Sequence, residues 1–383
     1  MALTWKQKFQ KYIKRSKQKA TLHTLIGTVC TLILVLVLNS MDRNVEVQIE
    51  RDPESQLTMT FVGDMMFGRN IDDVIVPKYG YDHLFKYVKN YFEYSDYTTG
   101  NFESPITRNE NYEKADKNIH LSTGEGAAEA LKNHGFYTVN LANNHMKDYG
   151  RQGLVDTLNA FKKQKIETVG AGTNLQEATQ IVYTTVQNKK IALLGFSDIL
   201  PKDFRAYSNR SGIAPADPNI FQPLVFKARQ NADLVIVQMH WGLEYDSGFH
   251  PRQQDLGRAL IDAGADVVLG HHPHVLEPVE VYNDGVIFYS LGNFVFDQGW
   301  SRTKESVLVQ LKNLQGDQYK LEIHPMMIRE GQPRPVRGWT ERYRREKIFS
   351  QVTGKLIYTD NWSREGDKLV RIIELKGAEK SDE

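Results

Sequence analysis

The sequence contains a single cysteine, Cys30, among its 383 residues, so an intramolecular disulfide bond is excluded. A large excess of charge of either sign is also missing, because 48 Lys and Arg residues nearly cancel 47 Asp and Glu residues. This balance gives no indication of a nucleic-acid partner. No internal repeat is visible. The hydrophobic content of 40% is ordinary for a globular protein, and the length allows one large domain or two smaller ones.

Acidic residues are missing from the first 19 positions, where seven Lys and Arg residues occur. An apolar run follows over residues 22–38, close to the shortest length that spans a bilayer. The sequence then becomes rich in acidic residues. This pattern predicts a basic cytoplasmic segment at 1–21, a transmembrane signal-anchor at 22–39 and a body outside the membrane.

A cleaved signal peptide is the alternative interpretation of this N-terminus. No A-x-A-like cleavage site follows Leu38, which favours an anchor that is retained. Cys30 lies too deep in the apolar run for a lipoprotein cleavage site, and we interpret it as a small apolar residue.

The rest of the chain alternates between apolar β-rich segments and segments of helical periodicity. Residues 40–56 are predicted to be a polar linker. Strands are expected at 57–64, 136–145, 167–172, 190–198, 232–242, 265–274 and 285–294, and helices at 81–95, 124–135, 150–164, 218–230 and 251–264. The alternation predicts an α/β sandwich or layered sheet. Segments 306–313 and 319–328 are expected to form a closing hairpin, and 331–383 a peripheral segment.

Polar side chains gather where the expected strands end. They are Asp64, Asn101, Glu103, Asn143, Asn144, His145, His240, His271, His272 and His274. In open α/β sheets ligands bind beyond the carboxyl ends of the strands, so these side chains are expected at one edge. Carboxylate, imidazole and amide ligands suit divalent Mn, Fe or Zn. An extended His272-Pro273-His274 segment would point both imidazoles to one side, where they can share metal ions.

Each of these residues also has a structural interpretation. Asp64 and Asn101 each follow a glycine and are typical turn residues. Asn143 and Asn144 could cap a helix, and a single strand-end histidine such as His240 is more often structural than a ligand. Their joint occurrence at five strand ends favours a common polar site that binds metal.

Six segments resemble the CapA/PgsA family of bacterial poly-γ-glutamate capsule synthesis proteins, itself similar to the calcineurin-like metallophosphoesterases. In chain order they are FVGDMMFGR, GNFESPIT, ANNHMKDYG, QMHWGLEYD, GADVVLGHHPHVLEPVEVY and VIFYSLGNFVFDQGW. The resemblance covers 57–330. It implies a four-layer α/β/β/α metallophosphoesterase-like sandwich there, preceded by one N-terminal transmembrane helix.

The resemblance also implies roles for individual residues. The metal ligands would be Asp64, Glu103, Asn144, His240, His272 and His274, holding one or two divalent ions of Mn, Zn or Fe. His145 would protonate a leaving group or stabilise phosphoryl oxygens, and Asp148 would orient it. His271 is an additional residue behind the ligands or at the rim. Asn101, Asn143 and Asn293 are further candidates for the rim, although Gly292-Asn293 could equally be a simple turn.

One imidazole of the phosphoesterase pattern is missing. Its first motif is usually Asp-x-His, but the chain has Asp64-Met65-Met66. Glu103, one methylene longer than Asp, occupies the position of the bridging carboxylate. A two-metal site could therefore be incomplete, could hold one ion, or could recruit another side chain such as His271.

Two functions follow from the resemblance. One is a membrane-anchored extracellular component of the poly-γ-glutamate synthesis and export machinery, whose partners would be other membrane subunits of the synthase complex and the anionic polymer. The other is an active metal-dependent phosphoesterase or hydrolase acting on a cell-surface substrate. The chain lacks a G-x-x-x-x-G-K-[ST] loop, so it is not the ATP-dependent ligase. Candidate polymer contacts, or simply solvated charges, are Arg69, Lys147, Arg151, Arg252 and Arg302.

Overall fold

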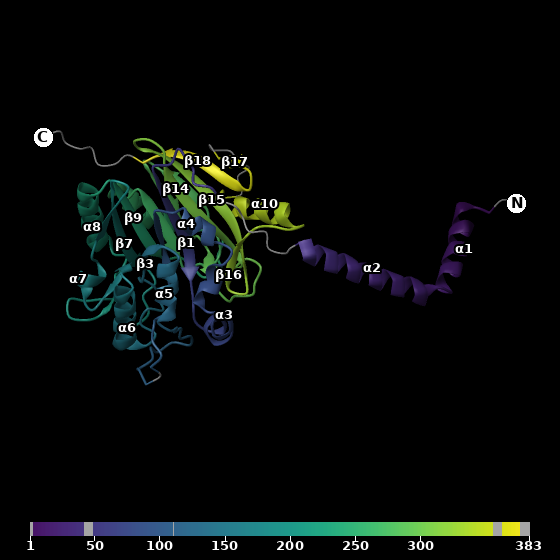
Figure 1. Ribbon diagram of the computed structural model, residues 1–383, viewed down its shortest axis with the longest axis horizontal. Coiled ribbons are helices and arrows are strands. Elements are labelled where there is room, and N and C mark those ends of the chain that lie inside the picture. Colours follow the sequence, from purple (N-terminus) through teal and green to yellow (C-terminus); the bar gives the residue numbers. More distant parts are fainter. Residues whose placement is uncertain (1–2, 42–48, 110, 355–361, 376–383) are drawn as a thin grey trace. The chain divides into compact units, whose positions relative to one another are not determined.

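The chain divides into an N-terminal helical unit and an α/β body. The computed structural model describes residues 3–41, 49–109, 111–354 and 362–375. The first unit contains α1 (Trp5–Lys17) and α2 (Ala20–Met41), and the second contains the layered body (Figure 1).

Helix α2 is long and apolar enough to cross a membrane. Its apolar part, Ala20–Leu38, has 19 residues, a mean hydropathy of 2.2 and no buried residues. About 20 apolar residues are needed to span the hydrocarbon core. One apolar N-terminal helix is therefore present where the sequence predicts a transmembrane segment. Residues 42–48 of the predicted linker lie outside the described residues.

Two large β-sheets form the centre of the body. The first has the strand order β17-β18-β15-β14-β1-β2-β3-β4, with β13 beside β1 and β16 beside β15. Its strands are β17 (Ser363–Glu365), β18 (Lys368–Glu374), β15 (Gln318–Arg329), β14 (Glu305–Asn313), β1 (Leu57–Met65), β2 (Tyr97–Phe102), β3 (Phe136–Asn140), β4 (Glu167–Val169), β13 (Asn293–Val295) and β16 (Gln332–Pro335).

The second sheet has the order β11-β12-β10-β9-β7-β6. Its strands are β11 (Val279–Tyr282), β12 (Gly285–Phe288), β10 (Val267–His271), β9 (Leu234–His240), β7 (Lys189–Ser197) and β6 (Val182–Val186). A small antiparallel pair joins β5 (Ala171–Gly172) to β8 (Gly212–Ile213).

Apolar side chains hold the two sheets face to face. Phe61 and Val309 of the first sheet share one core with Ile236 and Leu269 of the second. A second core packs α4 (Lys89–Glu93), α5 (Gly126–Asn133) and α6 (Gly150–Lys163) on the outer face of the first sheet. A third core packs α8 (Pro218–Asn231) and α9 (Pro251–Asp262) on the outer face of the second. The predicted four-layer α/β/β/α sandwich is therefore confirmed (Figure 1).

Most predicted elements form because their apolar residues repeat with the matching period. Leu256, Leu260 and Ile261 lie on one face of α9 and are all buried. The sequence TMTFVGD of β1 is buried on both faces, as expected for a central strand between two layers. The predicted hairpin is also confirmed, because β14 and β15 pair antiparallel from Glu305 with Met327 to Asn313 with Tyr319.

Four local predictions differ from the structure. The helix expected at 81–95 is broken into the 3-10 helix η2 (Tyr81–Phe85) and α4, because its aromatic and β-branched residues are weak helix formers. The strand β2 was expected only through its polar end at Asn101 and Glu103, because its Thr and Gly residues look like a loop until the sheet buries them. The strand β6 was missed. The strand expected at 167–172 is divided between β4 and β5, with Gly170 at φ 83° between them.

The first sheet continues beyond residue 330. Strands β16 and β18 both pair with β15, and β17 pairs with β18, so part of the segment expected to be peripheral extends the sheet edge. The remaining helices are η1 (Ile71–Ile75), α3 (Val76–Tyr79), α7 (Leu175–Ala178) and α10 (Glu341–Val352).

Candidate metal centre

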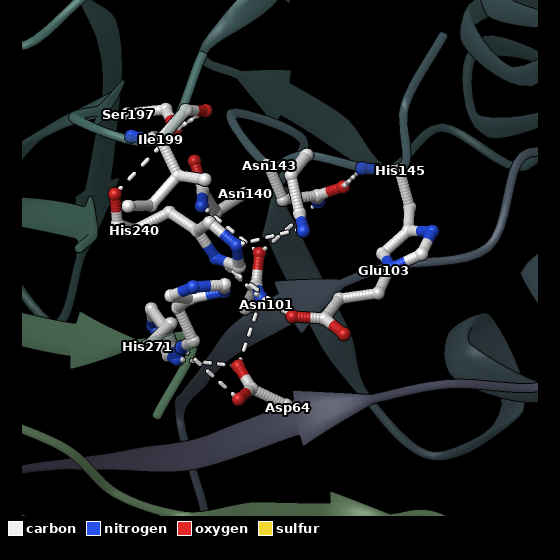
Figure 2. Close-up of polar contacts among 12 residues, drawn as sticks. Asp64, Asn101, Glu103, Asn140, Asn143, His145, Ser197, Ile199, His240 and His271 are labelled. Carbon is white, nitrogen blue, oxygen red and sulfur yellow. Dashed lines mark hydrogen bonds and ion pairs between the residues drawn. The ribbon is translucent and has the colours of Figure 1, made fainter. Parts of the chain in front are cut away.

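Strand pairing brings the predicted site residues together at one edge of the sandwich. In the first sheet Asp64 pairs with Asn101, and Asn101 pairs with Asn140. In the second sheet His240 pairs with His271. The two sheets meet where Asp64 Oδ1 lies 3.3 Å from His271 Nδ1 (Figure 2). The expectation that strand ends deliver these side chains to one place therefore agrees with the geometry.

Asp64, Glu103 and His240 form one group of possible metal ligands. Their ligand atoms all lie within 4.8 Å of one another, and all three side chains are buried. The Asn101 amide nitrogen is 2.8 Å from Asp64 Oδ1 and 2.9 Å from Glu103 Oε1. Its oxygen accepts hydrogen bonds from Asn140 at 3.0 Å and Asn143 at 3.3 Å, which fixes the orientation of the amide (Figure 2).

Glu244, His272 and His274 form a second group, also with ligand atoms within 4.8 Å of one another. Sequence reasoning missed Glu244, an exposed residue in the segment QMHWGLEYD. Its position four residues after His240 was the only available signal. The backbone N–H of His272 also donates to Asp64 Oδ2 at 3.2 Å, which connects the second group to the first.

The expected extended conformation of His272-Pro273-His274 is wrong. His272 has φ 99° and His274 has φ 58°, so both adopt left-handed backbone conformations that side-chain-bearing residues seldom tolerate. Such conformations cost about 1–3 kcal/mol each and persist where surrounding contacts hold them. The two rings still lie on the same side of the chain, with centroids 5.9 Å apart.

His271 lies against Asp64, whereas Met66 turns away. Met66 is buried in the apolar core on the helix side of the first sheet. His271 Nε2 is 3.0 Å from the side-chain oxygen of Gln238, whose nitrogen donates to Thr99 Oγ1 at 2.8 Å. Nε2 therefore carries a hydrogen, and Nδ1 faces the Asp64 carboxylate. A cation between these two atoms would satisfy both.

Burial and neighbouring charges shift the pKa values of the buried carboxylates and imidazoles in this group. Burial alone would raise the pKa of Asp64, but hydrogen bonds and charges from His271 and His274 hold that pKa well below its usual range. Burial, reinforced by the Asp64 charge, raises the pKa of Glu103 to about 8. Burial would lower the pKa of His274, but Glu103 and Asp64 raise it to about 9. A divalent cation would supply the same compensating charge.

Three buried atoms of the described ligand groups and of His271 have no hydrogen-bond partner: Glu103 Oε2, His271 Nδ1 and His272 Nδ1. Burial lowers the pKa of His272 to about 3. Burial, followed by the charge of His272, holds the pKa of His240 well below its usual value. Neutral imidazoles with free lone pairs and an unsatisfied carboxylate oxygen are the forms that bind metal, so the residues present fit a divalent ion.

Asn144 and His145 follow β3 and lie beside these groups. Asn144 Oδ1 is 3.0 Å from His240 Nε2. His145 Nδ1 is 2.8 Å from Asp148 Oδ2, so the Asp148 carboxylate faces the imidazole. Burial lowers the pKa of His145, although Asp148 opposes this shift.

Lys117 is a further residue that the sequence did not reveal. Its Nζ lies 2.6 Å from Asp148 Oδ1 and 3.1 Å from His145 Nδ1, and it donates to the Asn144 carbonyl at 2.7 Å. Lys117 belongs to a loop about 30 positions before His145 in the sequence. A local sequence motif does not extend over so many residues, so it could not reveal this contact.

The three asparagines expected at the rim are buried instead. Asn101 and Asn143 lie beneath the ligands, and Asn143 donates to the Phe102 carbonyl at 2.8 Å. Asn293 Oδ1 is 2.9 Å from His274 Nδ1, so this residue contacts a candidate ligand rather than lining an opening.

A cavity of about 440 Å³ opens beside the His145–Asp148 pair. Its charged lining residues are Glu113, Lys114, Asp116, Lys117, Lys147, Arg151, Lys202 and Asp203. Lys147 is buried and donates to the backbone carbonyls of Ser211 and Asp203. Two other predicted polymer contacts have carboxylate partners: Arg69 lies 2.6 Å from Asp297, and Arg252 lies 2.6 Å from Asp198.

Comparison with known sequences gives matches along nearly the whole chain. The profile of a family described as bacterial capsule synthesis protein PGA_cap matches residues 58–298. The chain is 43% identical over 368 residues to PGA biosynthesis protein CapA of Bacillus subtilis, covering 96% of each. It is 42% identical over 374 residues to Capsule biosynthesis protein CapA of Bacillus anthracis, covering 96% of this chain and 90% of the relative.

Solved structures resemble the chain more distantly. A calcineurin-like phosphoesterase, YfkN from Bacillus subtilis, has a TM-score of 0.39 and 14% identity, covering 78% of this chain and 98% of that one. A 5′-nucleotidase from Candida albicans has a TM-score of 0.44 and 12% identity, and the match covers 82% of this chain and 61% of the nucleotidase.

Proposed function

The chain belongs to the bacterial capsule synthesis protein PGA_cap family, and from this premise we propose that it is an accessory component of capsular poly-γ-glutamate synthesis and export. The observation that carries this proposal is the 43% identity to PGA biosynthesis protein CapA across 96% of both chains.

We further propose that α2 anchors the protein in the cell membrane with its N-terminus in the cytoplasm and its body outside. The support is charge asymmetry, since seven basic residues and no acidic residue precede α2. Other membrane subunits of the synthase complex would then lie within reach of the anchor.

For the metal centre, we propose that Asp64, Glu103 and His240 bind one divalent ion of Mn, Zn or Fe. His271 would supply the imidazole that is missing at position 66. Glu244, His272 and His274 are the ligands proposed for a second ion, with Asn144 close to His240. A bound ion would polarise an anionic oxygen of a substrate, while His145, oriented by Asp148, holds or transfers a proton at its ring nitrogen.

The cavity beside His145 is the proposed contact for the anionic polymer. Lys114, Arg151 and Lys202 are exposed on its lining, and the cavity volume of about 440 Å³ suits a small ligand segment. Charge reversal by Arg151→Glu with Lys202→Glu is expected to weaken binding of a labelled γ-linked glutamate oligomer to the full chain in detergent. The matched control is Lys227→Glu, which changes an exposed residue of α8 that does not line this cavity.

Metal-dependent hydrolysis of a cell-surface phosphoester is a second candidate function. It is favoured by one observation, the 2.8 Å pairing of His145 with Asp148 beside the candidate ligands. In polymer-producing cells that lack the native protein, the wild-type chain should restore production. Loss of production with His145→Ala at unchanged protein level would support chemistry, whereas full production would leave an assembly role.

Metal content tests the centre directly. The full chain purified in detergent should contain Mn, Zn or Fe, and Glu103→Ala and His272→Ala should lose most of it. His83→Ala is the control, because His83 lies outside both ligand groups and stacks on Tyr79 at 4.5 Å. Equally low metal in the wild type and in all folded variants would refute the metal centre without affecting the family assignment.

A further inference from the structure

Helix α1 has an apolar stripe along one face, and none of its residues is buried. Trp5, Phe9, Tyr12 and Ile13 recur at the spacing i, i+4, i+7 and i+8, which places them on one helical face. Trp5 is 80% exposed and Tyr12 is 67% exposed. Trp5 and Phe9 stack with ring centroids 5.6 Å apart, so the stripe is continuous over the first turns.

All charged residues of α1 are basic. Its six charged residues, which flank the stripe or lie opposite it, are Lys6, Lys8, Lys11, Lys14, Arg15 and Lys17. No Asp or Glu occurs before residue 42, so no carboxylate of this segment can neutralise them. The helix nevertheless has a defined start, because Thr4 and Gln7 cap each other's backbone N–H groups at 3.4 and 3.0 Å.

A free helix with this pattern is unfavourable in water. Isolated helices of about 12–15 residues are marginal, and α1 has only 13 residues. An anionic lipid surface would stabilise both faces of α1. The aromatic and aliphatic side chains would enter the boundary between headgroups and acyl chains, while the Lys and Arg side chains would remain at the lipid phosphates. Basic residues near such a surface contribute about 1 kcal/mol each.

We propose that α1 is an interfacial helix that binds anionic lipid at the leaflet where α2 enters the membrane. Helix α2 begins at Ala20, only two residues after α1 ends at Lys17 with Gln18 and Lys19 between them, so a spanning α2 holds α1 at the surface. The inference rests on the proposed anchor but is independent of the role in polymer synthesis.

Site-directed spin labelling tests this proposal in the full chain. In a Cys30→Ser background, Phe9→Cys reports on the stripe and Lys14→Cys on the opposite face. The chain is reconstituted into phosphatidylcholine vesicles with or without phosphatidylglycerol. In anionic vesicles the label at 9 should contact oxygen, which concentrates in lipid, and the label at 14 should contact a water-soluble nickel complex. Omitting phosphatidylglycerol should reduce the difference between the two labels in their exposure to oxygen and to the nickel complex.

Two results would overturn the interfacial helix. Equal exposure of both labels to the nickel complex would place α1 in water, and protection of the label at 9 from both reagents would indicate a protein partner. Resistance of the chain to extraction by alkaline carbonate tests the α2 anchor separately. Failure of the anchor is therefore distinguished from failure of α1 to bind lipid.

Discussion

At the scale of single residues, His271 and Met66 explain how this chain departs from the phosphoesterase pattern. The side chain at position 66 enters the apolar core, while an imidazole from the opposite sheet lies 3.3 Å from Asp64. The two positions are 205 residues apart in the sequence, so only the folded chain shows this arrangement. It supports the proposal that His271 takes the place of the missing imidazole.

His271→Ala is expected to weaken metal binding by about 10- to 100-fold, because it removes an imidazole that faces Asp64. Met66→His should fail to rescue it, since the new imidazole would be buried in an apolar core at a cost of about 1–3 kcal/mol. Metal titration of the purified chain, followed by elemental analysis, measures both effects. Unchanged affinity in His271→Ala would exclude this residue as a ligand.

Glu277 predicts a pH dependence of stability away from the candidate ligands. Burial raises the pKa of Glu277 to about 8, and Gln253 donates to its carboxylate at 2.8 Å. Its folded pKa lies above its unfolded pKa. The stability that it contributes is therefore complete below about pH 4 and is lost as pH rises towards 8.

Glu277→Gln should remove this loss while keeping the acceptor for Gln253. The wild type should lose on the order of 1 kcal/mol more stability than the variant between pH 5 and 8. Thermal melting by circular dichroism in detergent measures the difference. Parallel pH profiles for the two proteins would contradict the assignment.

At the scale of elements, the segment GHHPH depends on a close strand contact. A Cβ added at Gly270 would lie 2.0 Å from the Tyr289 carbonyl oxygen and 2.6 Å from that of Phe288. Only glycine allows β10 to approach the backbone of Phe288 and Tyr289 so closely just before His271. The glycine therefore helps to position the histidines that follow it.

Gly270→Ala is expected to destabilise the body by about 1–3 kcal/mol, because backbone must move to accept the methyl group. It should also lower metal content, since displacement of β10 moves His271. The control is Gly299→Ala, where nothing lies within 4 Å of the added Cβ. A melting temperature shared by both variants would show that β10 tolerates the change.

At the scale of the whole molecule, the candidate centre joins the two sheets. Asp64 and Glu103 come from the first sheet side, and His240 and His271 come from the second. The surrounding apolar core holds the sheets together, but at this edge the contacts are polar. A metal ion bound here would link both layers.

Metal is therefore expected to stabilise the body. An ion present at 100 times its Kd adds about 2.7 kcal/mol to the free energy of unfolding. Addition of Mn²⁺ should raise the melting temperature of the chelator-treated full chain, and Glu103→Gln should abolish the increase. His83→Ala should respond like the wild type. An increase that persists in Glu103→Gln would point to binding elsewhere.

The sequence by itself determined the N-terminal apolar helix, the alternating α/β architecture and most strand ends that carry polar residues. These features follow from local periodicity, and periodicity is visible in a single chain. Asp64, Glu103, His240 and His272 could be proposed as one group because parallel strands end at one edge of a sheet.

Only the tertiary structure decided which side chains face one another across the two sheets. The approach of His271 to Asp64, the addition of Glu244 to the His272–His274 pair and the reach of Lys117 to His145 depend on long-range packing. The left-handed backbone of His272 and His274 likewise follows from surrounding contacts rather than from local preference. Such contacts join residues separated by many positions, and no local pattern records them.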